Sequence, residues 1–472
     1  MAEIVVLGAG VIGLGTAMLL ANDGHDVTVL ERDATPPAST AEEAWESWER
    51  RGVNQFRLPH YFLARYRSVI DVELPEVARS IERVGGLRHN PLLDAPEGFR
   101  GPERSDDAAC EVLTGRRPVV ELAVADAAEH ARGVSVRRGT AVAALVSGPS
   151  IREGTPHVTG VRTESGEEVL GDLVVDMTGR RSATPRWLEA LGAKPPAEEL
   201  EDSGFMYFGR HYRSDDGTLP FAFGGGIQHL GTISALTLPA DNGTWGVAIV
   251  TSARDKALLG LRDLDRWESV VRSLPLIAHW LDGTPLDEKV VSMSKIEDRI
   301  RTFHDDDGPV ATGIVSVGDA WACSNPSLGR GASFGMLHAV LLRDLLRDVG
   351  LDDPFEFATT FHRSTDAELR PWFAWTRATD RHRLSQVDAG VAGEAYAPHD
   401  EDFELEQSLT SAASKDPDLL RVMVRGALVL ERPRDALSRL DLYDRVSELG
   451  GGWRDEPVAA PDRDELVRLA SA

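Results

Sequence analysis

The sequence predicts an α/β protein with a Rossmann-like domain, an inserted antiparallel β-sheet and a helical C-terminal region. Three observations lead to this fold class. A strand, a glycine-rich turn, a helix and a second strand follow one another over residues 4–31. Short apolar stretches alternate with polar residues over 200–300, which is typical of antiparallel strands. From Asp353 onward the pattern is mainly helical.

The first of these segments reads IVVLGAGVIGLGTAMLLANDGHDVTVLE. We expect a strand over Ile4 to Leu7, a helix over Leu14 to Asn22 and a strand over Asp26 to Leu30. This order, with three glycines between the first strand and the helix, is the βαβ fingerprint of dinucleotide binding. The segment therefore predicts a nucleotide site at the start of the chain.

The three glycines of this fingerprint and the acidic residue that ends it have separate physical roles. Gly8 allows the tight turn, Gly10 lets a pyrophosphate approach the backbone, and Gly13 lets the helix pack close to the strand. The N-terminus of the helix offers free N–H groups and a positive dipole end to phosphates. Glu31, at the end of the second strand, is placed to accept the ribose hydroxyls of an adenosine.

Composition limits the classes of partner. The chain has 472 residues, which is too many for one hydrophobic core, and a net charge of −25. Such a charge repels phosphate backbones, so nucleic acid is not expected as a partner. No apolar run is long enough to cross a bilayer, the chain enters a strand at once, and Cys110 and Cys323 form no disulfide or metal pattern. We expect a cytoplasmic protein without a transmembrane segment.

The order of these patterns suggests domain boundaries. We expect a nucleotide-binding domain over 1–199, a β-rich substrate domain over 200–300, a return to the first domain over 301–350, and a helical region over 351–472. Gly224, Gly225 and Gly226 lie in the β-rich stretch without a following helix pattern, so they do not predict a second dinucleotide site.

A second glycine-containing loop lies in the returning segment. Val315 to Val317 read as a strand, and Asp319 follows its end. Pro326, Gly329 and Gly331 come next, directly before a helix. Such a loop suits the close approach of a planar, electron-rich ring, and the helix N-terminus stabilises negative charge on that ring when it is reduced.

Three motifs, in this order, resemble a known family. GAGVIG with Glu31, DMTGRRSATPRWLEALG at 176–192 and GDAWACSNPSLGRG at 318–331 are similar to FAD-dependent monooxygenases related to aromatic hydroxylases and squalene-type epoxidases. The segment Gly52–Gln55 with His60 resembles actinobacterial polyether-type epoxidases and their oxidoreductase relatives. The resemblance covers about residues 1–345.

The resemblance implies FAD as cofactor and a set of residues that bind it. An arginine at the start of the helix after the second unit contacts the flavin chain in this family, and Arg117 stands there with Arg116 as a rival. The expected FAD-binding residues are Gly8, Gly10, Val11, Ile12, Gly13, Glu31, Arg32, Arg117, Val142, Asp319, Pro326, Gly329, Gly331 and Ala332.

The chain departs from the family pattern at two points. Arg330 lies between Gly329 and Gly331, where it faces either the pocket, as a contact to substrate or flavin, or solvent. The Asp-Gly pair that helps to bind NADPH in some hydroxylases is replaced by Asp176-Met177-Thr178-Gly179. The source of electrons is therefore open between NAD(P)H and a separate flavin reductase.

The resemblance implies a flavin monooxygenase that inserts one oxygen atom of O₂ into a hydrophobic small molecule through a C4a-hydroperoxide. No side chain is assigned a catalytic role, because the flavin carries this chemistry. A prenyl-reductase-like reductase or dehydrogenase is the alternative, and a non-catalytic FAD-binding protein is the third. Scattered histidines predict no metal site. Trp372 and Trp375 are expected to pack in a core, with a place in the substrate pocket as the alternative.

Overall fold

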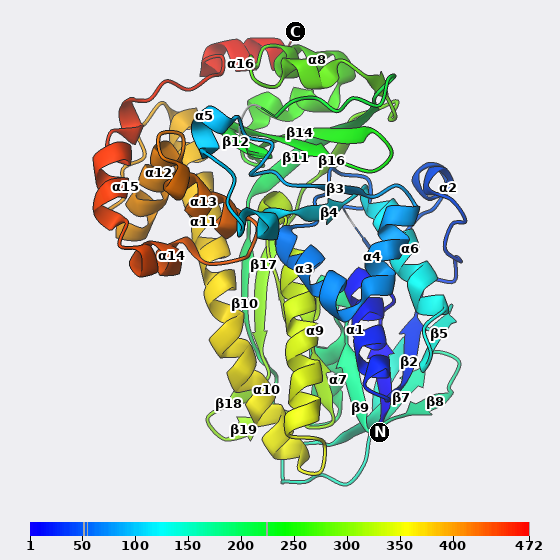
Figure 1. Cartoon of the computed structure of the whole chain (residues 1–472). Helices are drawn as coiled ribbons and strands as arrows, with labels where there is room; N and C mark the ends of the chain where they lie inside the picture. The colour runs from blue at the N-terminus through cyan, green and yellow to red at the C-terminus, as the bar shows by residue number, and fades with distance from the viewer. Residues whose placement is uncertain (51, 54, 223–224, 472) are drawn as a thin grey trace.

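A computed structural model describes residues 1–50, 52–53, 55–222 and 225–471. Two residues of the segments discussed above, Asn54 and Gly224, lie outside these ranges. Figure 1 shows the parallel sheet with its helices at one end of the molecule and the inserted sheet at the other, with the C-terminal helices alongside.

A five-stranded parallel sheet contains the expected βαβ unit. Its strand order is β20-β9-β1-β2-β5, and every neighbouring pair is parallel. The bounds are β1 Glu3–Leu7, β2 Asp26–Glu31, β5 Val134–Arg138, β9 Leu173–Asp176 and β20 Ile314–Ser316. Parallel strands place all their carboxyl ends on one edge, where ligands bind in such sheets.

The two faces of this sheet are covered differently. Ile4 and Val6 of β1 pack against the helical layer, whereas Val5 and Leu7 belong to a second core on the opposite face. The helical layer consists of α1 (Val11–Asn22), α6 (Arg117–Glu129) and α9 (Gly331–Asp348). An antiparallel sheet covers the other face, formed by β6 (Val142–Ser147), β7 (Val158–Thr163) and β8 (Glu168–Leu170), with α7 (Thr184–Ala190) beside it.

One expected hairpin is divided in the structure. The sequence pattern predicts a single second arm over Glu167 to Asp176. Instead, β8 pairs with β7, and the chain then turns at Gly171 to enter β9, which pairs with β1. The expectation of one arm is wrong, because Leu173 to Asp176 is an all-buried run that fits a central parallel strand better than a hairpin edge.

The inserted region forms the expected antiparallel sheet, with strand order β12-β13-β14-β11-β15 and β16 also paired to β11. The bounds are β11 Phe205–Arg213, β12 Ile227–Leu230, β13 Ile233–Pro239, β14 Thr244–Ser252, β15 Thr284–Pro285 and β16 Val291–Met293. One face packs on α8 (Leu264–Arg272) and on the last helix, α16 (Arg463–Ser471). The other face, with Tyr207 and Leu236, is turned toward Leu58 of the first domain.

A three-stranded sheet joins the two large sheets. β10 (Ala197–Asp202) pairs with β17 (Glu297–Thr302), which pairs with β21 (Ala322–Cys323). Figure 1 shows β10 and β17 running between the two ends of the molecule, close to α9 and α10. Shorter pairs are β3 (Leu87–His89) with β4 (Val112–Thr114) and β18 (His304–Asp305) with β19 (Gly308–Pro309).

Most of the remaining helices form two groups. The first lies between the βαβ unit and α6: α2 Ala41–Glu46, α3 Ala64–Glu73, α4 Pro75–Arg83 and α5 Glu97–Arg100. The second is the expected C-terminal region: α10 Pro354–Glu368, α11 Arg370–Ala392, α12 Glu401–Ala413, α13 Pro417–Ala427, α14 Pro433–Leu440 and α15 Tyr443–Gly450. In the part of the chain that the structure describes, no helix has the length and hydrophobicity that a membrane span requires.

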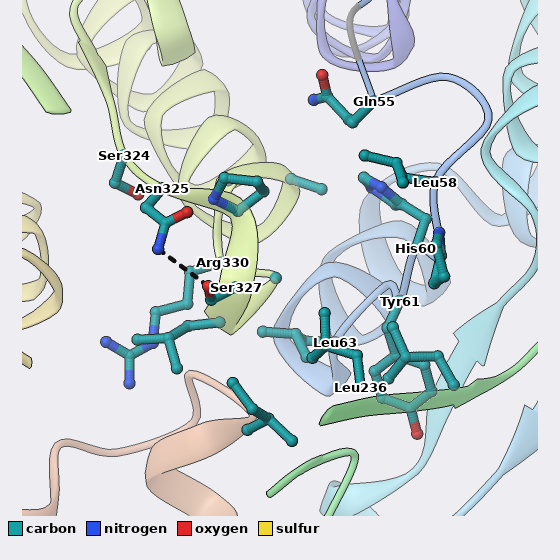
Figure 2. A pocket seen from close by; sticks show the side chains of 18 of the residues that line it. Gln55, Leu58, His60, Tyr61, Leu63, Leu236, Ser324, Asn325, Ser327 and Arg330 are labelled. Carbon is teal, nitrogen blue, oxygen red and sulfur yellow. Dashed lines mark hydrogen bonds between the residues drawn. The ribbon is translucent and has the colours of Figure 1, made fainter. Parts of the chain in front are cut away.

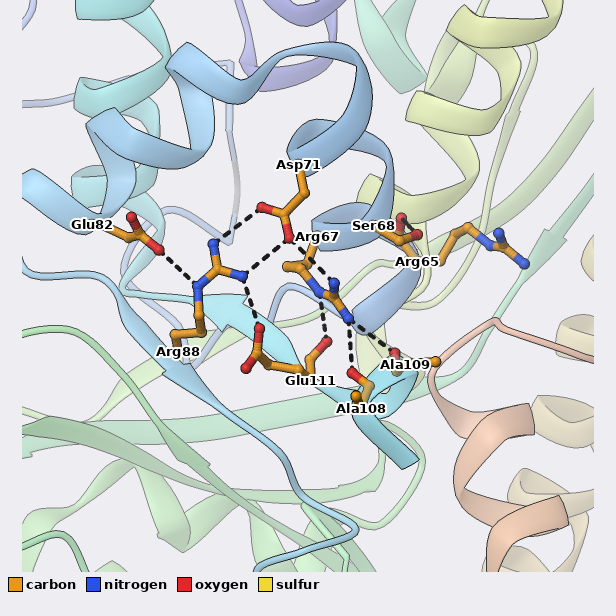
Figure 3. Close-up of polar contacts among 9 residues, drawn as sticks. All are labelled: Arg65, Arg67, Ser68, Asp71, Glu82, Arg88, Ala108, Ala109 and Glu111. Carbon is orange, nitrogen blue, oxygen red and sulfur yellow. Dashed lines mark hydrogen bonds and ion pairs between the residues drawn. The ribbon is translucent and has the colours of Figure 1, made fainter. Parts of the chain in front are cut away.

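A polar network fixes α3 against β3 and β4 (Figure 3). Arg88 donates to Asp71 and Glu111 at 2.8–3.1 Å, and Arg67 donates to the Glu111 carbonyl at 3.0 Å. Burial opposes ionisation of Asp71, but the hydrogen bonds from Arg88 and Arg67 hold its pKa below the ordinary range. The network holds α3, and the segment that leads into α3 lines the cavity described next.

Candidate functional site

A cavity of about 2820 Å³ lies where the parallel sheet, the inserted sheet and the C-terminal helices meet. A typical small-molecule pocket measures about 300–1,000 Å³, so this space holds more than one small ligand. One end is lined by the glycine turn before α1, the middle by the loop before α9, and another part by β11–β13 and α13.

The glycine turn has the geometry that the fingerprint predicts. Gly8 has φ +104°, and a Cβ there would lie 2.8 Å from the carbonyl oxygen of Met177. A Cβ on Gly13 would lie 2.0 Å from the Gly8 carbonyl oxygen, so only glycine fits. A Cβ on Gly10 would meet no atom within 4 Å, and Gly10 lines the cavity. The open space at Gly10 is therefore ligand space.

Glu31 lies at the end of β2, on the cavity wall. Its Oε2 accepts from the Ala9 N–H and from Arg50 Nη2, both at 2.9 Å, and its Oε1 accepts from the Asp33 N–H at 2.9 Å. Arg50 Nη1 also donates to Glu121 at 2.9 Å. Because a carboxylate has about four acceptor positions, Glu31 retains capacity for ribose hydroxyls. Sequence reasoning missed Arg50, whose partners lie far from it along the chain.

Asp319 lines the cavity from the turn that follows β20. It takes part in none of the hydrogen bonds among the described residues. The side chain is exposed to the cavity. The protein atoms around it desolvate the carboxyl group and raise its pKa, and the nearby charges of Arg117 and Arg180 oppose this effect. The carboxylate is therefore placed to accept hydroxyl groups from a ligand.

The loop before α9 brings the other predicted residues beside Asp319. Gly329 adopts a left-handed conformation with φ +65°, and a Cβ on Gly331 would lie 3.8 Å from Asp319 Oδ1. The N-cap residues of α9 and α1, Arg330 and Gly10, make no side-chain capping hydrogen bond. Pro326, Gly329, Gly331 and Ala332 all line the cavity. Two uncapped helix N-termini thus face one space.

Asn325 anchors this loop to three other elements. Its N–H donates to Asp298 of β17 at 2.7 Å, and its Nδ2 donates to Asp380 of α11 at 2.9 Å. The Tyr207 hydroxyl on β11 donates to Asn325 Oδ1 and contacts Ser327 Oγ. Figure 2 shows Asn325 and Ser327 on one wall, with Leu58 and His60 on the opposite wall.

The two candidate arginines at the start of α6 have separate environments. Arg117 lines the cavity, donates to Glu121 at 2.8 Å and lies 3.5 Å from His60 Nε2. Arg116 is fully buried and pairs with Asp241 at 2.7 Å. Of the two, Arg117 is the residue that reaches the cavity. Burial and the charge of Arg117 lower the pKa of His60 to about 3, so His60 is neutral.

Arg330 is 4 % exposed and lines the cavity, so of the two orientations that the sequence left open the solvent-facing one is not adopted. Its guanidinium lies 3.8 Å from the ring centroid of Trp375 and donates to Thr376 Oγ1 at 2.8 Å. Figure 2 shows this group pointing away from Leu58 and His60 on the far wall. The helix α11 supplies both partners, which the local GRG sequence does not reveal.

Two further buried side chains support the loops. His338 Nδ1 accepts from the Gly318 N–H at 3.2 Å, and burial lowers the pKa of His338 to about 3, which keeps it neutral. Arg301 donates to the Ala320 carbonyl at 2.7 Å and to the Arg180 carbonyl at 3.2 Å. Both hold the turn that carries Asp319. Sequence reasoning assigned neither of them a role.

Asp176, the first residue of the DMTGRRS motif, is buried and organises its own turn. Its Oδ1 accepts from the Thr178 N–H at 3.0 Å and from Thr178 Oγ1 at 2.6 Å. Its other oxygen accepts from Ser182 and Ser316. The motif thus joins the ends of β9 and β20 beside the cavity.

A hydrogen-bonded chain leads from the cavity wall to the surface. The Tyr61 hydroxyl lies 2.8 Å from His89 Nε2, and His89 Nδ1 lies 2.7 Å from Asp94. All three line the cavity. The exposed fraction of the side chain rises from 17 % at His89 to 54 % at Asp94. Burial raises the pKa of Tyr61, so its hydroxyl stays protonated.

The remaining predicted residues are placed as follows. Val11, Ile12, Arg32, Val142 and Gln55 line the cavity. Trp372 packs against a hydrophobic cluster, and Trp375 donates to Glu406. Cys110 and Cys323 are buried free thiols. Within the described residues, no group of three or more His, Cys, Asp or Glu side chains is arranged to hold a metal.

These observations test whether FAD fits the cavity. The space at Gly10, the two uncapped helix N-termini and the unbonded carboxylate of Asp319 are features that a dinucleotide with a flavin ring uses. The residues present therefore fit FAD.

Comparison with known proteins gives a consistent result. Residues 3–70 match the family model described as FAD dependent oxidoreductase. Protein Rv3254 of Mycobacterium tuberculosis is 25 % identical over 387 residues, which cover 78 % of this chain and 77 % of that protein.

Two solved structures are similar over most of the chain. The flavin-dependent brominase Bmp2 has a TM-score of 0.60 and 14 % identity, over 94 % of this chain and 99 % of that one. PqsL of Pseudomonas aeruginosa, a probable FAD-dependent monooxygenase, has a TM-score of 0.53 and 16 % identity, over 82 % of this chain and 99 % of that one. The expected likeness to FAD-dependent monooxygenases is confirmed at the level of the fold, and the first βαβ unit matches the model of FAD-dependent oxidoreductases.

Proposed function

We propose that this FAD-dependent oxidoreductase, built on the fold of FAD-dependent monooxygenases, inserts one oxygen atom of O₂ into a hydrophobic small molecule. The observation that carries the proposal is a shared cavity: the loop at Asp319 and the apolar face of the inserted sheet line one continuous space. A substrate and a flavin held there meet without an intervening wall.

The residues at the glycine turn would hold the nucleotide part of FAD. The N–H groups at the start of α1 and the space at Gly10 receive the pyrophosphate, and Glu31 receives ribose hydroxyls. Arg32 and Val142 also line the cavity.

Asp319, Arg117 and the N-terminus of α9 would hold the flavin end. Asp319 accepts hydroxyls of the ribityl chain, and Arg117 supplies positive charge near it. Pro326, Gly329, Gly331 and Ala332 present backbone to the ring. When bound, reduced FAD activates O₂ for transfer of one oxygen atom.

The apolar wall would hold the substrate and keep water out. This wall combines residues of the inserted sheet, of the segment before α3, of α13 and of the position just after α13: Leu58, Leu63, Leu236, Ala248, Met293, Leu420, Val424 and Leu428. Exclusion of water strengthens the electrostatic interactions inside the site and limits hydrolytic side reactions.

The chain's own residues also handle protons. With Asp94 holding His89 Nδ1–H, His89 Nε2 is the acceptor for the Tyr61 hydroxyl. The Tyr61 oxygen then accepts a hydrogen bond from a substrate hydroxyl in the cavity. The series of hydrogen bonds from Tyr61 through His89 would carry the proton of that substrate hydroxyl toward Asp94, which is the more exposed residue.

The test is anaerobic reduction followed by rapid mixing with O₂. We expect an absorbing species that differs from both reduced and oxidised flavin, and we expect ¹⁸O from ¹⁸O₂ in the product once a substrate is found. Direct return to the oxidised spectrum without such a species would contradict oxygen transfer. It would favour the alternative, a reductase or dehydrogenase similar to prenyl reductases. A protein that binds FAD but neither accepts nor transfers electrons would leave only the non-catalytic role.

The electron source is tested in the same apparatus. We propose NAD(P)H or a separate flavin reductase, because the Asp-Gly pair of some hydroxylases is replaced at Asp176. Anaerobic mixing with NADH, with NADPH and with a reductase system identifies the donor by the rate of flavin bleaching.

A further inference from the structure

Arg383, on α11, is a buried arginine at the edge of the cavity. It is 8 % exposed and lines the cavity opposite the turn between β12 and β13. Its Nε donates to Ser234 Oγ at 3.1 Å, and its Nη2 donates to the carbonyls of Gly231 and Ile233 at 2.9 and 2.6 Å. Its Nη1 takes part in none of the hydrogen bonds among the described residues.

Most buried arginines of this chain have a carboxylate partner, and Arg383 does not. Eight arginines are buried among the described residues. Six of them lie within 4.0 Å of an Asp or Glu oxygen: Arg50, Arg116, Arg210, Arg301, Arg343 and Arg421. Arg330 stacks on Trp375 and is influenced by Glu406 and Asp380. In the described part of the chain, Arg383 alone of the eight has no ion pair and no acidic group that influences its pKa.

The titratable groups near Arg383 are neutral or have other partners. Asp380 lies one turn before Arg383 on α11, but it accepts from Asn325 Nδ2, and burial raises its pKa well above the ordinary value, which favours its neutral form. Burial lowers its pKa to about 10, which still leaves it charged at neutral pH. His229 on β12 is neutral, because burial and the charge of Arg383 lower its pKa to about 3. None of the described cavity-lining residues on β12, β13 and α11 is acidic. Glu456, which lines the cavity from the C-terminal segment, pairs with Lys415. A buried cation without a partner is costly, and a bound anion removes this cost.

We propose that Arg383 binds a carboxylate group of the substrate, with Gln386 one helical turn away as a second donor. The proposal rests on the proposed function, since it takes the cavity as the substrate site, and it narrows the substrate to an apolar molecule with a carboxylate. The free Nη1 of Arg383 is the donor that the hairpin contacts leave for this ligand.

A purely structural role for Arg383 is the rival explanation, because its other donors clamp the β12–β13 turn. The side chain of Gln386 separates the two roles. Residues three apart on a helix are about 5–6 Å apart, so Gln386→Glu places a carboxylate beside Arg383 without removing the clamp. Gln386→Met is its matched control, since it removes the amide without adding charge.

The experiment measures binding of decanoate and of uncharged decanamide to the FAD-loaded protein by titration calorimetry. We expect the parent protein to bind decanoate at least about tenfold more tightly than decanamide, because charge-assisted hydrogen bonds are the stronger ones. Gln386→Glu and Arg383→Gln should abolish this preference. Gln386→Met should keep most of it. Arg381→Gln should keep all of it, because Arg381 lies on the same helix, pairs with Glu201 and does not line the cavity.

Two results would overturn the proposal. One is a parent protein that binds decanoate no better than decanamide, including one that binds neither. The other is a Gln386→Glu protein that keeps the preference. If Arg383→Gln fails to fold, the Gln386→Glu and Gln386→Met proteins still test whether Arg383 binds the carboxylate. Because the titration involves no oxygen transfer, its failure is distinct from failure of the reoxidation test.

Discussion

At the scale of single residues, Gly10 is where the nucleotide turn leaves open space toward a ligand. Its φ of −80° is accessible to any residue, and an added Cβ meets no protein atom within 4 Å. Gly10→Ala should therefore leave the thermal stability of the FAD-free protein unchanged and weaken FAD binding about tenfold, or about 1.4 kcal/mol. FAD titration by fluorescence quenching measures this.

The matched control for that substitution is Gly98→Ala. Gly98 also has open space around its Cβ position, but it does not line the cavity. Equal FAD affinity in Gly10→Ala and Gly98→Ala would mean that the pyrophosphate lies elsewhere.

The adjacent arginines at the start of α6 should behave oppositely when each is replaced by alanine. Arg116→Ala leaves Asp241 buried without its partner, which costs about 3–5 kcal/mol of unfolding free energy. Arg117→Ala leaves Glu121 paired with Arg50, so stability changes little while FAD affinity falls. Urea unfolding and FAD titration of both variants measure the contrast. Reversed effects would transfer the FAD contact to Arg116.

Asp298 should make stability depend on pH. It is 2 % exposed, and burial raises its pKa from 3.8 to about 6. The folded state therefore holds this proton more tightly than the unfolded state, and stability falls as the pH rises from about 4 to about 6. The loss from this group amounts to about 3 kcal/mol.

The substitution Asp298→Asn isolates that contribution. In the parent protein the Asn325 N–H donates to the Asp298 carboxylate at 2.7 Å, and an amide oxygen can still accept this hydrogen bond. We expect the parent's unfolding free energy to fall relative to that of the variant between pH 4 and pH 7. If the unfolding free energies of the two proteins changed with pH in the same way, the raised pKa of Asp298 would be refuted.

At this scale, the residues that sequence predicted are those whose role is local. Gly8, Gly10 and Gly13 act within one turn, so their spacing alone reveals them. Arg50 and Arg383 act on partners far away in sequence, and no local pattern marks either. Arg330 shows the same limit: its sequence neighbours left two orientations open, and a helix some 45 residues away decided between them.

At the scale of elements, periodicity predicted most helices and strands but not their pairing. The pattern of the buried run Leu173 to Asp176 predicts a strand whether the run forms a hairpin arm or a central strand of the parallel sheet. Only the parallel register with β1, in which Val5 faces Val174, places it in the main sheet. Likewise, the alternation over 200–300 predicts antiparallel strands, but it does not reveal that β10 and β17 leave that sheet to form a bridge.

The last helix, α16, should contribute to the stability of the inserted sheet. Leu466 is 1 % exposed within the core formed with Trp267, and Arg463 donates to Asp255 at 2.6 Å. Leu466→Ala should lower the unfolding free energy by about 2–5 kcal/mol. Val467→Ala, one position along on a less buried side, should cost much less. Chemical unfolding measures both, and equal costs would mean that α16 does not pack as described.

At the scale of the whole molecule, the cavity has walls from segments that are distant in the chain. The glycine turn, the loop at Asp319, the inserted sheet and α13 all contribute. Sequence reasoning placed the first two beside FAD and expected the inserted sheet to form the substrate pocket. It did not foresee that the C-terminal helices would form part of the wall, because the resemblance ended near residue 345 and helical periodicity carries no information on docking.

This arrangement predicts what removal of FAD will do. A ligand that binds only the folded protein stabilises it by about 2.7 kcal/mol when present at 100 times its Kd. Protein stripped of flavin at high bromide concentration should therefore unfold at a lower temperature, and added FAD should restore the original Tm. Amide hydrogen exchange should become faster in residues 8–13 and 318–332, which belong to the nucleotide and flavin ends of the cavity. Exchange in the interior strand β14 should change little, because the core that contains this strand lies apart from the FAD end. Identical melting and exchange with and without FAD would place the cofactor outside this cavity.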